Sequence, residues 1–306
     1  MKVPALRALL LAAAAALAIG PLRAAPLLFH DHGHGLSFSP EGKALLAPSH
    51  GGLAAYEDGA WWEAPGPAQG FSGFSVAERW LYASGHARPQ KASGEPAGLI
   101  RSADGGRTWQ RLALGGEADF PLVAAGYRTG AIYVLAARPN SAMPAPGLYL
   151  TRDEGRSWRR ATARGLEGEI HALAAHPAEP GTLAAGSDRG LFLSRDGGER
   201  FRRLAGSGPV TAVSFDHEGA RLYYARALSS EVVQATLAGR ERRALRLPLA
   251  HGDYVTCIAH SPVDERVLAF ATRRRDVFLS KDGGLSWRRL ASEGEARDQA
   301  AGEEER

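Results

Sequence analysis

The sequence predicts an all-β protein, a six-bladed β-propeller of four-stranded antiparallel blades. Three observations support this fold class: an eight-residue motif that occurs four times, the regular spacing of its copies, and inner strands of similar sequence. The motif reads Ser or Thr, any residue, Asp, Gly or Glu, Gly, two residues and an aromatic residue. Its copies are SADGGRTW (102–109), TRDEGRSW (151–158), SRDGGERF (194–201) and SKDGGLSW (280–287).

Each copy is expected to form the corner of a β-hairpin, and we call the four copies the corner segments. The Asp carboxylate accepts backbone N–H bonds within the turn, and Gly supplies positive φ without a steric cost. The aromatic residue then buries a large apolar area beneath the corner. These residue types need no substrate, so a structural role is predicted for Ser102, Asp104, Gly106, Trp109, Asp153, Trp158, Asp196, Phe201, Asp282 and Trp287.

The spacing of the corner segments gives the number of blades. Their aspartates are 49, 43 and 86 residues apart, so a unit without a corner segment is expected near Gly239. Asp58, in AYEDGAWWEA, marks a degraded copy one unit before the first. Repeats of about 40–45 residues built from short strands are typical of propeller blades. The sequence therefore predicts six units.

The chain divides into three segments. Residues 1–25 are predicted to be a secretory signal peptide, because Lys2 and Arg7 precede an apolar run that is too short for a stable membrane anchor. Residues 26–291 are expected to form the propeller, and residues 292–306 a disordered acidic tail. We therefore expect an exported protein, secreted or periplasmic in a bacterium, with no membrane span after cleavage of the signal.

Composition narrows the possible functions. The formal net charge of +4 falls close to +1 without the three basic residues of the signal segment. A charge this small argues against nucleic-acid binding. The single cysteine, Cys257, allows no internal disulfide and is expected to be a small buried hydrophobic residue. We expect a monomer.

Blade geometry predicts where a site would lie. Turns between the first and second strands of a blade, together with the corner segments, should share one face, which we call the corner face. Loops between the second and third strands and connections between blades should share the other, the mouth face. The mouth face surrounds one end of the central channel. The channel is expected to be lined by aligned inner strands, HGLSFSP (34–40), HALAAHP (171–177) and TCIAHSP (256–262).

Histidine and aspartate residues are expected to gather on the mouth face. Imidazole and carboxylate ligands suit a divalent transition metal. The alternative is a set of hydrogen-bonded or solvated histidines beside a wet channel. The candidate metal ligands are His34, His50, His86, Asp119 and His171, whereas His176, His217 and His260 fall on the corner face.

Arginines recur in the loops of the mouth face. Arg binds carboxylate, sulfate or phosphate through two parallel hydrogen bonds, so a ring of arginines would hold a small anionic ligand or a protein partner. The alternative is ordinary loop arginine in an Arg-rich protein. The candidate ligand-binding residues are Arg88, Arg138, Arg189, Arg226 and Arg273. Arginine pairs on the fourth strands are expected to prevent edge-to-edge association.

The corner segments resemble the BNR/Asp-box repeats of the sialidase-like superfamily, which are six-bladed propellers. Similar repeats occur in sortilin-type receptors, in xyloglucan-active glycosidases and in photosystem II assembly factors. The segments HGLSF, SHGGL, ASGH and GEADF also resemble secreted bacterial propellers described as glycosyl hydrolases or exo-sialidases. The resemblance implies a substrate-binding Arg on the first blade, but no Arg lies between His34 and Trp62.

Three functions therefore remain open. The first is a non-catalytic exported propeller that binds a metal ion, an anionic ligand or a protein partner. The second is a glycoside hydrolase, for which Asp119 is the best candidate acid, although the two carboxylates that such an enzyme needs are not evident. The third is an assembly factor for a membrane complex, which rests on similarity of fold alone.

Overall fold

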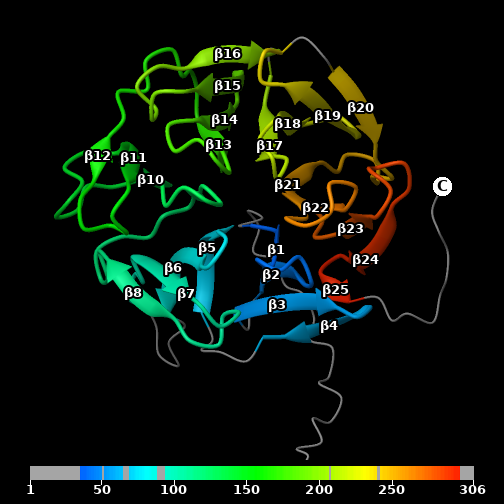
Figure 1. Cartoon of the computed structure of the whole chain (residues 1–306), viewed down its shortest axis with the longest axis horizontal. Helices are drawn as coiled ribbons and strands as arrows, with labels where there is room; N and C mark the ends of the chain where they lie inside the picture. The colour runs from blue at the N-terminus through cyan, green and yellow to red at the C-terminus, as the bar shows by residue number, and fades with distance from the viewer. Residues whose placement is uncertain are drawn as a thin grey trace, which may run out of the picture.

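A computed structural model describes residues 35–49, 52–64, 69–87, 94–206, 208–239 and 242–296, and these residues form a six-bladed β-propeller (Figure 1). Six antiparallel sheets surround a central axis, and each sheet consists of consecutive strands. The predicted fold class is confirmed. The described residues contain no helix, and therefore none that is long and apolar enough to cross a membrane.

The first three blades have four strands each. Blade 1 contains β1 (Ser37–Phe38), β2 (Leu45–Ser49), β3 (Gly52–Glu57) and β4 (Ala60–Glu63). Blade 2 contains β5 (Gln69–Val76), β6 (Leu81–Ala87), β7 (Leu99–Ser102) and β8 (Gln110–Ala113). Blade 3 contains β9 (Val123–Ala125), β10 (Ile132–Ala136), β11 (Gly147–Thr151) and β12 (Arg159–Arg160).

The other three blades complete the ring. Blade 4 contains β13 (Ile170–Ala175), β14 (Leu183–Ser187), β15 (Gly190–Ser194) and β16 (Arg202–Ala205). Blade 5 contains β17 (Val210–Phe215), β18 (Arg221–Arg226), β19 (Glu231–Thr236) and β20 (Arg242–Arg246). Blade 6 contains β21 (Val255–His260), β22 (Leu268–Thr272), β23 (Val277–Ser280), β24 (Arg288–Ser292) and β25 (Glu295–Ala296).

The expected limits of the propeller differ from the structure at its end. Strand β24 continues to Ser292 and pairs with β25, so the sheet of blade 6 passes the expected end at residue 291. Residues 292–296, assigned to the disordered tail, are therefore part of the sheet. The signal segment and residues 297–306 lie outside the described residues.

The hydrophobic core lies between neighbouring blades. Side chains alternate along each strand, so one set packs on the preceding blade and the other on the following blade. Trp61 packs with Leu279 and Leu290 of blade 6, whereas the next residue, Trp62, packs with Leu53 and Phe71 at the contact with blade 2. The same division applies to all six contacts between blades in the described residues.

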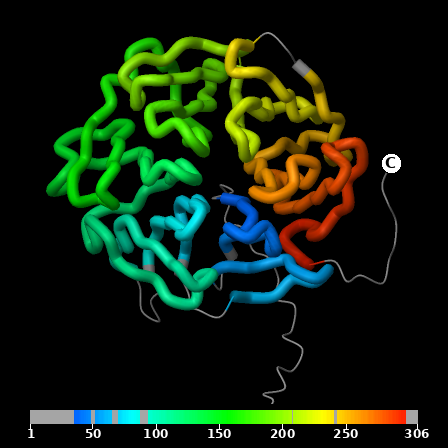
Figure 2. The backbone as a smooth tube through the Cα atoms, in the orientation of Figure 1, coloured from blue at the N-terminus to red at the C-terminus, as the bar shows by residue number. Residues whose placement is uncertain are grey.

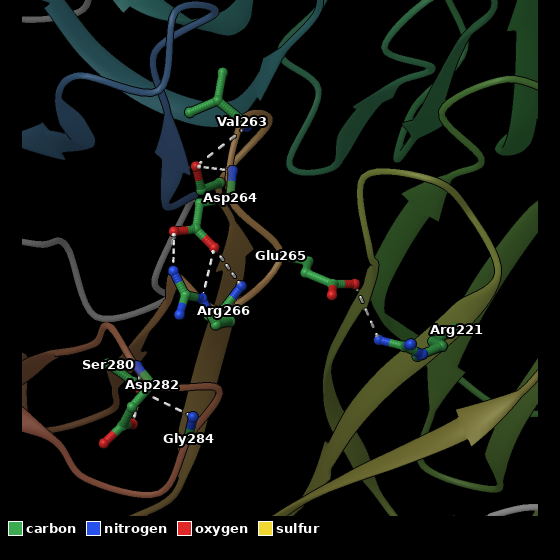
Figure 3. A network of polar contacts seen from close by, with 9 residues as sticks. Arg221, Val263, Asp264, Glu265, Arg266, Ser280, Asp282 and Gly284 are labelled. Carbon is green, nitrogen blue, oxygen red and sulfur yellow. Dashed lines mark hydrogen bonds and ion pairs between the residues drawn. The ribbon is translucent and has the colours of Figure 1, made fainter.

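The corner segments form hydrogen-bonded turns, as their composition predicted. In the last one, Ser280 Oγ donates to Asp282 Oδ1 at 2.8 Å and accepts from Gly284 N at 2.8 Å (Figure 3). Ser286 donates both its backbone N–H and its hydroxyl to Asp282. These bonds stabilise the ionised carboxylate and lower the pKa of Asp282 to about 2.

The first turn of a blade and its corner segment lie on the same face. Gly197 N donates to Gly181 O at 2.8 Å in blade 4, and Gly283 N donates to Arg266 O at 2.8 Å in blade 6. Figure 3 shows the second pair of loops side by side, with Glu265 reaching Arg221 of blade 5 at 3.6 Å. The predicted corner face is therefore present.

Arginines of the fourth strands join neighbouring blades. The residue that follows the corner aromatic faces the next blade: Arg159 Nη2 donates to Gly197 O at 2.8 Å, and Arg202 Nη2 donates to Leu237 O at 3.0 Å. Arg288 donates to Tyr56 Oη across the closure of the ring. The sequence predicted only that these arginines prevent edge association. The first arginine of each pair also bonds to the next blade.

The ring closes through side chains. Blade 6 ends beside blade 1, as the red and blue ends of the tube show in Figure 2. Each sheet consists of consecutive strands, so none of the described strands is exchanged between the first and last blades. Trp61 Nε1 instead donates to Leu290 O at 3.0 Å, next to the Arg288–Tyr56 contact.

Candidate functional site: the central channel and its mouth

A cavity of about 790 Å³ follows the axis of the propeller. All six inner strands line it, with small and apolar side chains and a few hydroxyl groups, including those of Ser37, Thr211 and Thr256. Small residues occur here because six strands converge on the axis. The volume lies within the range of small-molecule and peptide pockets. The channel is therefore large enough to be a binding site.

Tyr127 lies across the corner-face end of this channel. Its Oη donates to Pro40 O of blade 1 at 2.8 Å, and its ring packs edge-on against His217 of blade 5, with centroids 5.0 Å apart. Blades 1, 3 and 5 are not neighbours in a six-membered ring, so these contacts cross the axis. Tyr127 thus narrows the channel at the corner face.

A histidine and an arginine hold Tyr127 in place. Arg128 Nη1 lies 3.0 Å from His217 Nε2, and Arg128 N donates to Pro177 O of blade 4 at 2.8 Å. Burial and the Arg128 guanidinium lower the pKa of His217, so a neutral ring accepts from Arg128. Contacts to several blades thus hold the corner-face end of the channel in place.

His260 and Cys257 lie in the channel wall of blade 6. His260 packs against the Tyr223 ring, with centroids 4.2 Å apart, and its buried Nε2 has no hydrogen-bond partner in the described structure. Burial lowers the pKa of His260 to about 3 and raises the pKa of the Cys257 thiol to about 11. His260 was predicted only to fall on the corner face, and the structure shows that its side chain also lines the channel.

Three of the candidate arginines lie directly beside the channel mouth. Arg138 follows the lining residue Ala137, and Arg226 precedes the lining residue Ala227. Arg273 N donates to the carbonyl of the lining residue Tyr254 at 3.0 Å. These positions place the three arginines next to lining residues, and their role in ligand binding stays a prediction.

The arginines differ in how far they are free to bind a ligand. Arg226 Nη2 donates to Tyr224 Oη at 3.2 Å, and Arg189 Nε lies 3.6 Å from Asp188 Oδ2. The guanidinium groups of Arg138 and Arg273 make no hydrogen bond or ion pair within the described part of the chain. Arg138 and Arg273 are therefore the most available, while Arg88 lies outside the described residues.

Asp253 organises the loop that carries Arg273, and sequence reasoning gave it no such role. The residue is 5% exposed, and its Oδ1 accepts from Tyr254 N at 2.9 Å and from Arg274 N at 3.1 Å. The connection into blade 6 is thereby bonded to the β22–β23 loop. The only available signal was the HGDY sequence, in which an Asp precedes an aromatic residue at a blade boundary.

The candidate acid Asp119 is paired with two neighbours on the mouth face. Ser72 Oγ donates to Asp119 Oδ2 at 2.7 Å, and His86 Nδ1 lies 3.8 Å from the same oxygen. The Asp119 side chain is 37% exposed and the His86 side chain 48% exposed, so both are open to solvent. The structure brings these two predicted residues together, beside the channel and not within its lining.

The other predicted metal ligands are more scattered. His171 is exposed and lines the channel on blade 4, while His34 and His50 lie outside the described residues. Across the described ranges, no three His, Cys, Asp or Glu side chains form a group that could hold a metal ion. The metal site therefore stays a prediction.

Comparison with known proteins adds relatives of the fold. No family model matches the chain. A stretch of 57 residues is 39% identical to a xyloglucanase of Hypocrea jecorina (strain QM6a), covering 19% of this chain and 7% of that protein. The GH74 xyloglucanase of Xanthomonas campestris superposes with a TM-score of 0.55 and 18% identity, over 87% of this chain and 46% of that one.

Two further structures extend the comparison. The GH74 enzyme of Niastella koreensis has a TM-score of 0.56 at 14% identity, over 87% of this chain and 46% of that one. YCF48 bound to D1 peptide has a TM-score of 0.51 at 17% identity, over 89% of this chain and 85% of that one. The chain thus spans about half the length of the GH74 structures. At these identities the likeness shows a shared propeller fold.

Proposed function

We propose that the protein is an exported, non-catalytic binding propeller that holds an anionic, extended segment of a partner protein at the channel mouth. One observation carries the proposal: Tyr127 narrows the channel at the corner face, and beside its opposite end the guanidinium groups of Arg138 and Arg273 have no partner among the described residues. The apolar wall would take the end of the segment. The guanidinium groups of Arg138 and Arg273 would bind its carboxylates, since Arg binds carboxylate through paired hydrogen bonds.

YCF48 supplies a precedent for this kind of ligand, because its structure contains a D1 peptide. The similarity covers most of both chains, unlike the GH74 matches, which cover under half of the enzyme. Arg138 on blade 3 and Arg273 on blade 6 stand on opposite sides of the ring. An extended segment lying across the mouth could contact both.

A peptide library tests this proposal. Hexapeptides with free carboxyl termini are screened for binding, and the affinity of a selected peptide is measured by fluorescence anisotropy. The double substitution Arg138→Gln/Arg273→Gln is expected to weaken binding at least about 100-fold, because the two lost charged hydrogen bonds together contribute about 3–6 kcal/mol. Lys281→Gln, on the corner face, is the matched control and should bind as the wild type does. Absence of any enriched peptide, or equal affinity of the double variant, contradicts the proposal.

A glycoside hydrolase is the second candidate function, favoured by the stretch that is 39% identical to a xyloglucanase. Asp119 is its best acid, with Ser72 and His86 beside it. An assignment to the sialidase-like superfamily would rest on the corner segments. The absence of an Arg between His34 and Trp62 argues against it. An assembly factor for a membrane complex would be a form of the binding function proposed above.

Enzyme assays separate the two candidates. If the protein is a hydrolase, xyloglucan or a fluorogenic sialoside should be turned over, and Asp119→Asn should lower the rate at least about 100-fold, as expected for loss of a general acid. Asp188→Asn is the matched control, because that exposed carboxylate already bonds to Glu169 N. Turnover that survives Asp119→Asn, or none in the wild type, removes this assignment for Asp119.

A further inference from the structure

Trp62 occupies a fourth-strand position that in three other blades holds an arginine bonded to the next blade. The residue after the corner aromatic is Arg159, Arg202 or Arg288 in three blades, and each donates a hydrogen bond to the corner region of the following blade. In blade 1 the equivalent residue, after Trp61, is Trp62, which pairs with Ala55 and faces blade 2. The indole cannot reproduce the arginine contact, and a hollow remains at this blade boundary.

That hollow is a groove of about 320 Å³ on the corner face. Trp62 lies on its blade 1 side, and the first corner segment, from Ser102 to Arg107, lies on its blade 2 side. The indole is only partly buried, so an apolar surface is open to the groove. The Asp104 carboxylate also borders the groove, but Ser102 and Thr108 already donate hydrogen bonds to it.

Besides the Asp104 carboxylate, six charged side chains surround the groove, three of each sign. None of them makes a side-chain hydrogen bond or ion pair with another described residue, in contrast to the arginines at the other blade boundaries. The acids are Glu41, Glu57 and Glu78, and the bases are Lys43, Arg79 and Arg107. With Asp104 the groove carries four acids against three bases, so its net charge is small and gives no strong preference for an anion or a cation. It does offer both hydrogen-bond acceptors and donors within one small space.

We propose that this groove binds a pyranose unit of a neutral carbohydrate. A pyranose ring has an apolar face of C–H groups, whose partial positive charge suits the negative face of the Trp62 indole. Its hydroxyl groups both donate and accept, so they can bond to carboxylates and to guanidinium or ammonium groups together. A volume near the lower limit for ligand pockets fits one or two sugar rings.

The site is separate from the proposed peptide site. The groove lies between blades 1 and 2 on the corner face, whereas Arg138 and Arg273 lie beside the channel mouth. Sugar binding in the groove would therefore persist in the Arg138→Gln/Arg273→Gln variant. Failure of one proposal leaves the other unaffected.

Calorimetric titration of the full protein with cellotetraose, xylotetraose and mannotetraose tests the groove. At least one is expected to bind with a Kd of about 0.1–1 mM. Trp62→Arg restores the residue type found in three other blades and should weaken that binding at least about 10-fold, while thermal unfolding shows that the variant is folded. Glu78→Gln/Arg79→Gln, which changes only exposed side chains, should also weaken binding. Lys281→Gln, on the same face of blade 6, should not.

Two results would overturn the proposal. One is the absence of saturable heat with all three tetrasaccharides up to about 10 mM, a concentration that still detects weak binding. The other is unchanged affinity in a folded Trp62→Arg variant together with unchanged affinity in Glu78→Gln/Arg79→Gln. Either result would assign the groove to packing alone.

Discussion

Replacing Trp61 by alanine is expected to lower the free energy of unfolding by about 3–5 kcal/mol, the usual cost of truncating a buried aromatic residue. Trp61 is 3% exposed and packs edge-on against Tyr56, with ring centroids 5.3 Å apart. Its Nε1 also donates to Leu290 O of blade 6 at 3.0 Å. The substitution therefore removes apolar contacts and a hydrogen bond at the closure of the ring. Urea unfolding followed by circular dichroism measures the change.

The adjacent tryptophan is the matched control. Trp62→Ala removes the same side chain one residue later, but from a partly exposed site that faces the groove, so its effect should be clearly smaller. Trp61→Phe keeps most of the apolar contact and removes the hydrogen bond, which predicts an intermediate loss. Equal losses for Trp61→Ala and Trp62→Ala would show that ring closure does not depend on Trp61.

The effect is concentrated at this boundary because no described strand is shared between the first and last blades. The other boundaries are joined by a covalent connection as well as by packing. Blade 1 and blade 6 have only non-covalent contacts in the described structure, among them the Trp61–Leu290 bond, the Arg288–Tyr56 contact and the apolar core around Leu36. A loss of packing there is therefore expected to weaken the closure of the ring more than a similar loss at another boundary.

The fold was predictable because it depends on local signals that recur. The corner segments need a Ser or Thr, an Asp and a Gly at fixed spacing, and those residues make the same hydrogen bonds in each copy, from Ser102 to Ser280. Blade 5 lacks a corner segment, yet its position followed from the regular interval. Its strands form where that interval placed them.

The site was only partly predictable because its contacts join residues far apart in the sequence. Blade geometry assigns the loops of Asp119 and His86 to the same face, and the two side chains lie close together in the structure. Tyr127 carried no comparable signal, because its partners Pro40 and His217 are defined only once the ring is closed. The same holds for Trp62, whose unusual position appears only when the residue after each corner aromatic is compared across blades.

The other large expected effect is an acid destabilisation that depends on His260. Its buried Nε2 has no hydrogen-bond partner among the described residues, and burial lowers its pKa to about 3. The imidazole has a pKa of about 6.5 in an unfolded chain. Above pH 6.5 the ring is neutral in both states, and this stability is fully present. As the pH falls below 6.5, the unfolded chain takes up the proton first, so the free energy of unfolding declines until the folded pKa is reached.

By this linkage the wild type should lose about 3 kcal/mol between pH 7 and pH 4 through His260 alone. His176 and His217 add to the loss, because burial lowers their pKa values as well. His260→Phe keeps an aromatic ring beside Tyr223 and removes the titrating group, so it should abolish most of the decline. His171→Phe, at the exposed mouth, should keep it.

Urea unfolding at pH 7 and pH 4 for the three proteins measures these differences. Equal declines in the wild type and His260→Phe would mean that the channel wall admits the protonated ring without cost. The expected result would also mean that His260 controls the polarity of the channel wall. A neutral, desolvated ring in the channel wall keeps that wall apolar at neutral pH, and protonation would place a positive charge inside the cavity. The channel would then favour an apolar segment at pH 7 and lose that preference in acid, together with the stability of the blade that forms it.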